Sequence, residues 1–284
     1  MGWICYTVPD EWAFISQNTQ RGRQAVNCIV CVASVPDTAS VIKVGADGNS
    51  IDEAGIKWIV SPFDEYALEE ALQLTEAKGG EVTVVTYGPV RAEAALRDCL
   101  ARGAHQAIHI VGGEATLGDS FTIAKVLAAV LKDREYDLVL CGIQGVGTDS
   151  SQVGQMLAVL LDLPSVAIVT KLEVGDGSLT AEREVEGAKE VVESPMPALI
   201  TCQKGLNEPR YAALKGIMAA KKKPVEEIDV ASLGIEEGAD PFYRVESLTL
   251  PPEKAAGTII QGEDDPSAAA AELVKLLREE AKAI

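Results

Sequence analysis

A short apolar run that leads through a glycine-rich loop into a helix is the feature that most constrains this chain. The run spans residues 138–141, and its continuous apolar character is typical of a strand buried on both faces of a sheet. Residues 142–152 form the loop, which is rich in Gly, Thr and Ser. The apolar residues that follow recur at helical spacing, at Val153, Leu157, Leu160 and Leu161.

The composition of this loop is typical of an anion site. Gly142, Gly145 and Gly147 can take positive φ and let the backbone approach a ligand closely. Ser150 or Ser151 is expected to cap the helix, whose N-terminus offers unpaired N–H groups and the positive end of its dipole. The loop therefore predicts a phosphate or pyrophosphate cradle. An ordinary glycine-rich turn remains the alternative, because the loop matches neither G-x-G-x-x-G nor G-x-x-x-x-G-K-[ST].

Strand and helix patterns alternate from residue 27 to about residue 162. This alternation predicts an α/β fold with right-handed crossovers and a doubly wound, mostly parallel sheet. The helix after residue 60 has a clear start, because Ser61 suits the N-cap, Pro62 suits N1 and Asp64 completes an S-x-x-D capping box. A short strand is expected at 41–44, further strands at 166–174, 179–192 and 198–202, and a helix at 210–223.

Three regions are expected along the chain: an N-terminal extension (1–26), an α/β nucleotide-binding domain (27–223) and a C-terminal arm (224–284). The arm is acidic and weakly periodic to about residue 264, so it lacks the apolar repeat for a core of its own. Its last part, 268–281, has the pattern of an amphipathic helix.

Charge and cysteine usage exclude several classes of function. The formal net charge is −18, whereas nucleic acids and anionic membranes attract a basic surface. Cys28 and Cys31 form a Cys-x-x-Cys, but residues i and i+3 of a strand face opposite sides of a sheet. Packed thiols are therefore expected, rather than a metal or redox pair. With no secretory leader in the sequence, a reducing, cytoplasmic setting is expected.

The sequence offers no recognisable catalytic machinery. Its two histidines are His105 and His109, and His109 alternates within an apolar strand pattern, as a core or sheet-end residue does. No cluster has zinc-ligand spacing, and no catalytic triad is apparent. In doubly wound sheets a ligand binds beyond the carboxyl ends of the strands. Those ends are expected near Cys31, Ser61, Tyr87 and residues 141–153, and together they predict one crevice for a purine and a phosphate.

Several separated motifs resemble those of the electron transfer flavoprotein beta subunit. Residues 206–224, Leu-Asn-Glu-Pro-Arg-Tyr-Ala-Ala-Leu-Lys-Gly-Ile-Met-Ala-Ala-Lys-Lys-Lys-Pro, are similar to the segment that contacts partner dehydrogenases in that family. Residues 182–193 and 197–201 resemble the family signature, with Ala188 where the pattern has Gly or an acid. Residues 61–65 resemble its Asn-Pro-Phe/Tyr-Asp motif with Ser in place of Asn, and residues 144–156 resemble its nucleotide loop. The likeness covers residues 27–284.

The resemblance implies a subunit of a heterodimeric electron carrier. It implies a Rossmann-like beta subunit that buries a structural AMP and pairs with an alpha subunit, which holds most of an FAD. The carrier would take electrons from acyl-CoA or other dehydrogenases, as in fatty acid oxidation, and pass them to a quinone oxidoreductase or another acceptor. Carried over by position, the nucleotide contacts would be Cys31, Ser61, Pro62, Phe63, Asp64, Tyr87, Gly142, Gln144, Gly145, Val146, Gly147, Thr148, Asp149, Ser150, Ser151, Gln152 and Val153. The dehydrogenase-docking residues would be Leu206, Asn207, Glu208, Pro209, Arg210, Tyr211 and Leu214, and the arm would wrap the alpha subunit.

Two alternatives stay open at this point. In electron-bifurcating, NADH-oxidising members of the family a second FAD takes the place of AMP. Val35-Pro-Asp-Thr is common in those members, whereas Leu206-Asn-Glu-Pro-Arg-Tyr favours the ordinary ones. A remote alternative is an ATP pyrophosphatase, because residues 145–150 faintly resemble the Ser-Gly-Gly-x-Asp-Ser loop of those enzymes.

Overall fold

The computed structural model describes residues 4–6, 25–113, 119–235, 245–252, 256–262 and 264–284. The chain divides into two compact units, residues 1–248 and residues 249–284. The expected N-terminal extension lies largely outside the described residues, of which it contributes 4–6, 25 and 26. Among the described residues, no helix is long and apolar enough to cross a membrane.

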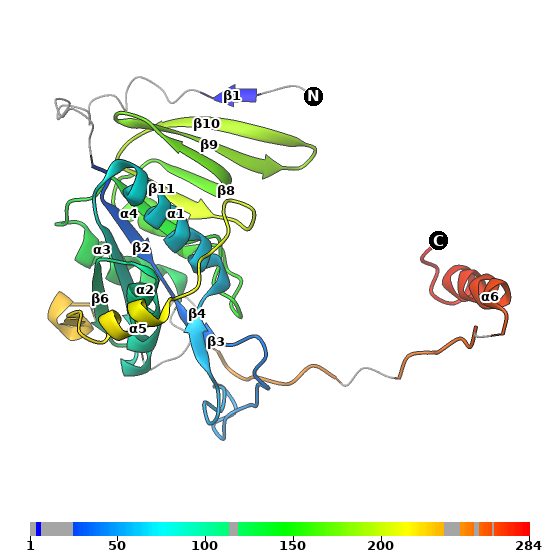
Figure 1. Ribbon diagram of the computed structural model, residues 1–284. Helices are drawn as coiled ribbons and strands as arrows, with labels where there is room; N and C mark the ends of the chain where they lie inside the picture. The colour runs from blue at the N-terminus through cyan, green and yellow to red at the C-terminus, as the bar shows by residue number, and fades with distance from the viewer. Residues whose placement is uncertain (1–3, 7–24, 114–118, 236–244, 253–255, 263) are drawn as a thin grey trace. The chain divides into compact units, whose positions relative to one another are not determined.

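A ten-stranded sheet organises the first unit (Figure 1), with the strand order β1-β10-β9-β8-β11-β7-β2-β5-β6-β12. The neighbours from β8 to β12 in this order are parallel, whereas β9 pairs antiparallel with both β8 and β10. The strands are β1 (Ile4–Tyr6), β2 (Cys28–Cys31), β5 (Val82–Gly88), β6 (Gln106–Val111), β7 (Leu138–Gly142), β8 (Ser165–Val174), β9 (Ser178–Val185), β10 (Ala188–Pro195), β11 (Ala198–Cys202) and β12 (Glu226–Asp229). A separate antiparallel pair consists of β3 (Ser34–Pro36) and β4 (Trp58–Val60).

Helices cover both faces of the parallel strands, which confirms the predicted doubly wound α/β fold. They are α1 (Pro62–Lys78), α2 (Glu93–Arg102), α3 (Ser120–Leu131), α4 (Val153–Leu160) and α5 (Leu214–Ala220), with short 3-10 turns at Val90–Ala92 and Val230–Leu233. One apolar core includes Leu68 of α1 and Leu96 of α2, and the other includes Leu131 of α3 and Leu157 of α4. The second unit contains α6 (Pro266–Glu279).

The cysteines of β2 lie on opposite faces of the sheet, as the strand period predicts. Cys28 belongs to the core under α1 and α2, and Cys31 belongs to the core under α3 and α4. Among the described residues, the cysteines Cys28, Cys31, Cys99, Cys141 and Cys202 are free and buried. Within the same residues, His, Cys, Asp and Glu form no group able to hold a metal ion.

Four local predictions differ from the structure. The strand expected at 41–44 is reduced to one bridge between Val44 and Ile51. The strand expected at 179–192 is a hairpin, because Gly187 has a φ of 75° and reverses the chain between β9 and β10. The helix expected at 210–223 starts at Leu214 and ends at Ala220. Finally, β12 adds residues of the expected arm to the sheet, parallel to β6.

Candidate functional site

The crevice predicted from the sequence lies where the strand order reverses. The chain runs outward from β2 through β5 to β6 and then returns to place β7 on the other side of β2. Cys31 and Cys141, near the carboxyl ends of β2 and β7, are therefore direct neighbours in register. This is the position at which open α/β sheets bind ligands.

A cavity of about 170 Å³ opens at this point. It brings together most of the residues predicted from the sequence: Cys31, Asp64, Tyr87, Gly142, Gln144, Gly145, Thr148, Ser150, Ser151, Gln152 and Val153. Val146 and Gly147 line an adjacent cavity instead, and Ser61, Pro62, Phe63 and Asp149 line neither. The sequence interpretation missed Ser120, Ile123 and Leu127 of α3, because nothing in a helical apolar pattern distinguishes a residue that faces a ligand from one that faces the core.

The loop from β7 to α4 has an unusual backbone. Three of its residues have positive φ: Gly147 at 100°, Asp149 at 47° and Ser151 at 53°. Side chains hold this shape, since Gln144 Nε2 donates to Asp149 Oδ1 at 2.9 Å and Ser151 Oγ donates to Gln144 Oε1 at 3.1 Å. The loop is thus held in shape by hydrogen bonds between its own polar side chains.

The predicted serine cap of the next helix is wrong. The residue before α4 is Gln152, and no side chain caps it. Ser151 cannot take that role, because an N-cap residue has extended backbone whereas Ser151 is left-handed. The first N–H groups of α4 are therefore left without a side-chain cap, at a helix end that lines the cavity.

Asp64 connects the two strand ends beside the cavity. Its carboxylate accepts hydrogen bonds from the backbone N–H of Ala33 at 2.7 Å and of Gly142 at 2.8 Å. The predicted capping box is therefore wrong, because Asp64 turns away from the start of its own helix toward β2 and β7. The approach is close enough that a Cβ on Gly142 would overlap the Asp64 carboxylate. Burial raises the pKa of Asp64 to about 7, against the lowering effect of the two backbone donors.

Ser61 lies behind this contact. Its side chain makes no capping hydrogen bond, and Oγ is a buried atom without a partner among the described residues. Its backbone N–H donates to the carbonyl of Ala33 at 2.9 Å. Ser61 therefore helps to join α1 to the end of β2 through its backbone, as part of the support of the crevice.

The cysteines of the crevice are packing groups. Cys31 and Cys141 both line the cavity and share a thiol hydrogen bond. That hydrogen bond, together with burial, raises the pKa of Cys141 well above its usual range. A protonated thiol is a poor nucleophile, so Cys141 offers no covalent chemistry. His109 is also buried, with Nε2 3.1 Å from the carbonyl oxygen of Gly88, as a sheet-end residue is expected to be.

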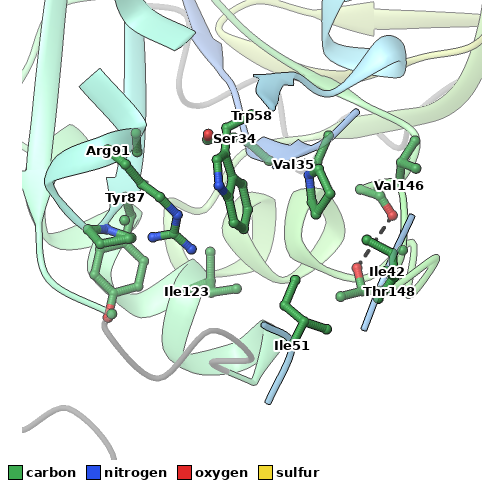
Figure 2. Close-up of a pocket in the computed structure, with 18 of the residues that line it drawn as sticks. Ser34, Val35, Ile42, Ile51, Trp58, Tyr87, Arg91, Ile123, Val146 and Thr148 are labelled. Atoms are coloured by element: carbon green, nitrogen blue, oxygen red, sulfur yellow. Dashed lines mark hydrogen bonds between the residues drawn. The ribbon is translucent and has the colours of Figure 1, made fainter. Parts of the chain in front are cut away.

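A second cavity of about 410 Å³ adjoins the first (Figure 2). The two share Ala33, Tyr87, Ile123, Gly145 and Thr148. The Arg91 guanidinium lies over the Trp58 ring, 3.9 Å from its centroid, and pairs with Glu53 at 2.7 Å. Figure 2 shows Arg91 beside Trp58, and the apolar side chains of Val35, Ile42 and Ile51 line the same cavity. Sequence reasoning predicted Tyr87 and the loop residues 145–148 of this cavity. It missed Trp58 and Arg91, because residues from separate strands and turns show no common periodic pattern.

The predicted docking residues form an irregular segment after β11, except Leu214, which is the first residue of α5. Tyr211 and Leu214 are 93% and 78% exposed, whereas Leu206 packs against the core. Asn207 Nδ2 donates to the carbonyl of Tyr66 at 3.0 Å and to Glu70 at 2.9 Å, which fixes the start of the segment on α1. The segment therefore presents an aromatic and an aliphatic side chain to solvent from a fixed base.

Comparison with known proteins places this architecture in a family. The model of the electron transfer flavoprotein domain matches residues 48–233. The chain is 44% identical to the electron transfer flavoprotein subunit beta of Bacillus subtilis (strain 168) over 261 residues, 91% of this chain and 100% of the relative. It is 39% identical to the subunit of the same name in Bradyrhizobium diazoefficiens, over 89% of this chain and 98% of the relative. It is 35% identical to the subunit of the same name in Bos taurus, over 84% of this chain and 94% of the relative.

Proposed function

Because this chain belongs to the electron transfer flavoprotein beta subunit family, we propose that it pairs with an alpha subunit and binds AMP in the crevice between β2 and β7. The flavin of the heterodimer, an FAD held mainly by the alpha subunit, would supply the redox chemistry. The heterodimer would carry electrons from acyl-CoA or other dehydrogenases to a quinone oxidoreductase or another acceptor. This chain would contribute a nucleotide site, a docking segment and an arm for its partner.

The observation that carries the proposal is the loop from β7 to α4. Its left-handed residues and the uncapped start of α4 provide backbone donors beside a cavity at the switch point of the sheet. Such a helix end favours a phosphate through both its N–H groups and its dipole. The adjoining apolar cavity offers space for a base, with Tyr87 between the two volumes. Both carboxylate oxygens of Asp64 accept hydrogen bonds from backbone N–H groups. We therefore expect Asp64 to shape the crevice without touching the ligand.

A structural rather than catalytic role for the nucleotide follows from the groups around it. Cys141 is protonated, and Asp64 is engaged with the backbone on both sides. Neither is available as a nucleophile or as a base toward a phosphate. The crevice is thus suited to hold a nucleotide unchanged and to stabilise the fold by mass action.

The second cavity favours one alternative, a second FAD in place of AMP. A tricyclic ring needs a larger apolar volume than AMP does, and the cavity of about 410 Å³ beside Trp58 and Arg91 provides one. With a second flavin the protein would be the beta subunit of an electron-bifurcating, NADH-oxidising flavoprotein. Nucleotide and flavin content separate the two functions.

The test is Gly147→Val in a heterodimer made by co-expression with the cognate alpha subunit. Gly147 has a φ of 100° with nothing within 4 Å of a Cβ, so the variant changes the backbone of the loop rather than filling a space. A positive φ is unfavourable for a β-branched residue such as valine. We expect AMP content, measured by chromatography after denaturation, to fall at least about tenfold and the melting temperature to decrease. Flavin absorbance per heterodimer should stay the same.

Gly187→Val is the matched control. Gly187 also has positive φ and open space around a Cβ, but it lies in the turn between β9 and β10. This variant should keep its AMP. Unchanged AMP content in Gly147→Val would contradict the proposed site. A loss of flavin absorbance in proportion to nucleotide would show that the site holds a second FAD.

A further inference from the structure

We infer that Arg210, through Glu69 and Glu76 of α1, holds the docking segment in the conformation that presents Leu214. This inference rests on the proposed docking role of residues 206–214. It makes Arg210 a positioning residue, whose effect reaches a partner dehydrogenase through the shape of the segment rather than through contact.

The docking segment needs such a support because it has no regular secondary structure. Residues 207–213 form neither helix nor strand, between the end of β11 and the start of α5. A segment of this kind has no ladder of backbone hydrogen bonds to fix its shape. Side chains from neighbouring elements must fix it, or the segment moves freely and loses entropy on docking.

Both the side chain and the backbone of Arg210 make hydrogen bonds to neighbouring helices. Its Nε and Nη2 donate to the two carboxylate oxygens of Glu69 at 2.8 and 3.0 Å, and Nη1 and Nη2 donate to the two oxygens of Glu76. Its backbone N–H donates to Glu69 at 3.1 Å, and its carbonyl accepts from Arg102 Nη1 of α2 at 3.4 Å. One residue therefore links the irregular segment to two helices through both its side chain and its backbone.

The burial of Glu69 separates this arrangement from an ordinary surface ion pair. The side chain of Glu69 is 5% exposed, whereas that of Glu76 is 58% exposed. Burial alone raises the pKa of a carboxyl, yet hydrogen bonds from Arg210 and Gln73 hold the pKa of Glu69 below its usual value. Glu69 is thus a buried carboxylate that depends on Arg210, and removal of the guanidinium leaves its charge poorly compensated.

The other end of the segment is fixed as well. A Cβ on Gly216 would overlap the carbonyl oxygen of Ala101, so α5 packs directly on the backbone of α2. Arg97 of α2 also donates through Nη1 to the carbonyls of Ala220 at 2.9 Å and Lys223 at 2.6 Å. Leu214 stands exposed between these two anchors. The geometry is that of a preorganised loop, which binds more tightly because less freedom is lost on docking.

The test uses heterodimers carrying Arg210→Gln or Arg210→Lys, with a purified acyl-CoA dehydrogenase as electron donor. Lys keeps the charge but cannot bridge two carboxylates in bidentate fashion. Hydrogen exchange of peptides covering residues 204–216 reports the mobility of the segment, and the transfer rate against dehydrogenase concentration separates KM from kcat. Arg134→Gln is the matched control. Arg134 also makes a bidentate pair, with Glu226, and its two hydrogen bonds are 3.2 and 2.7 Å long. This pair lies outside the docking segment.

We expect both Arg210 variants to exchange about tenfold faster in this segment and to raise KM for the dehydrogenase about tenfold with kcat unchanged. Arg134→Gln should change neither. If hydrogen exchange in Arg210→Gln is the same as in the wild type, the inference is overturned. It is also overturned if exchange is faster but KM for the dehydrogenase is unchanged, while Leu214→Ala raises that KM. If Leu214→Ala leaves KM unchanged too, the docking function itself fails, and the exchange data still decide whether Arg210 holds the segment.

Discussion

Asp64 shows how one side chain can shape a cavity through hydrogen bonds to the backbone around it. Its two oxygens join the end of β2 to the end of β7, the two strands that flank the crevice. The geometry needs an acceptor on both sides, which a carboxylate supplies and an amide does not. Because the Asp64 carboxylate is buried, its negative charge has a cost in folded-state stability.

The cost predicts a pH dependence. The folded pKa of Asp64 is about 7, raised from an ordinary value of 3.8, so between these values the folded state binds more protons than the unfolded one. The contribution of Asp64 to the free energy of unfolding therefore falls as the pH rises from about 4 to about 7. Asp64→Asn removes the titration. We expect the melting temperature of the variant heterodimer, relative to the wild type, to increase from pH 5 to pH 8.

Glu70→Gln serves as the comparison for this measurement. Burial raises the pKa of Glu70 too, but this group accepts from Asn207 of the docking segment and lies outside both cavities. Asp64→Asn should reduce AMP content, whereas Glu70→Gln should leave it unchanged. A constant difference in melting temperature between Asp64→Asn and the wild type across this pH range would contradict the assignment.

At the scale of elements, α5 combines a packed base with an exposed apolar end. Its first residue, Leu214, is 78% exposed and Met218 is 58% exposed, while Ala220 is buried. A leucine left in solvent contributes little to folding, but it can act as an anchor in a small interface. Exposure and position therefore favour docking over packing for Leu214.

We predict that Leu214→Ala weakens transfer from a dehydrogenase without destabilising the heterodimer. An apolar anchor in such an interface contributes about 1–3 kcal/mol, so KM should rise on the order of tenfold or more. The melting temperature and flavin content should stay the same. Leu131→Ala in α3 is the contrast, because Leu131 is fully buried and its truncation should cost about 2–5 kcal/mol of stability. Earlier melting with unchanged transfer in Leu214→Ala would mark a packing leucine.

At the scale of the whole molecule, the second unit is the part that lacks a core. α6 has no buried residue, and among its described residues Leu273 and Val274 are 49% and 45% exposed. Ile259, upstream in the same unit, is 82% exposed. Apolar side chains with this exposure favour burial against a partner. We propose that this partner is the alpha subunit of the heterodimer.

We therefore expect residues 249–284 to be protected in the heterodimer and cleaved in the beta chain alone. Limited proteolysis with a glutamate-specific protease measures this, since Glu272, Glu279 and Glu280 lie within α6 or at its end. Fragments are identified by mass. The same digestion should leave β7 intact in both samples, because residues 138–141 are buried. A beta chain that is monodisperse alone and protects residues 249–284 would contradict this expectation.

Local pattern alone determined the doubly wound α/β fold, the core strands and the position of the crevice. Buried parallel strands are short apolar runs, such as residues 28–31 and 138–141, and amphipathic helices repeat every three to four residues. Both signals depend on near neighbours in sequence. The order of strand, glycine loop and helix at residues 138–160 likewise predicts the cavity at the end of β7, where the anion site is proposed.

Only the tertiary structure decided how individual polar residues are used. Asp64 fits a local capping box, but its partners, Ala33 and Gly142, lie 31 and 78 positions away. Arg210 meets Glu69 across 141 positions, and the expected arm begins with a strand on β6. Side-chain hydrogen bonds of this kind depend on which surfaces the folded sheet brings together. Periodicity encodes which face of an element is buried, and the packing of that face selects the polar partners.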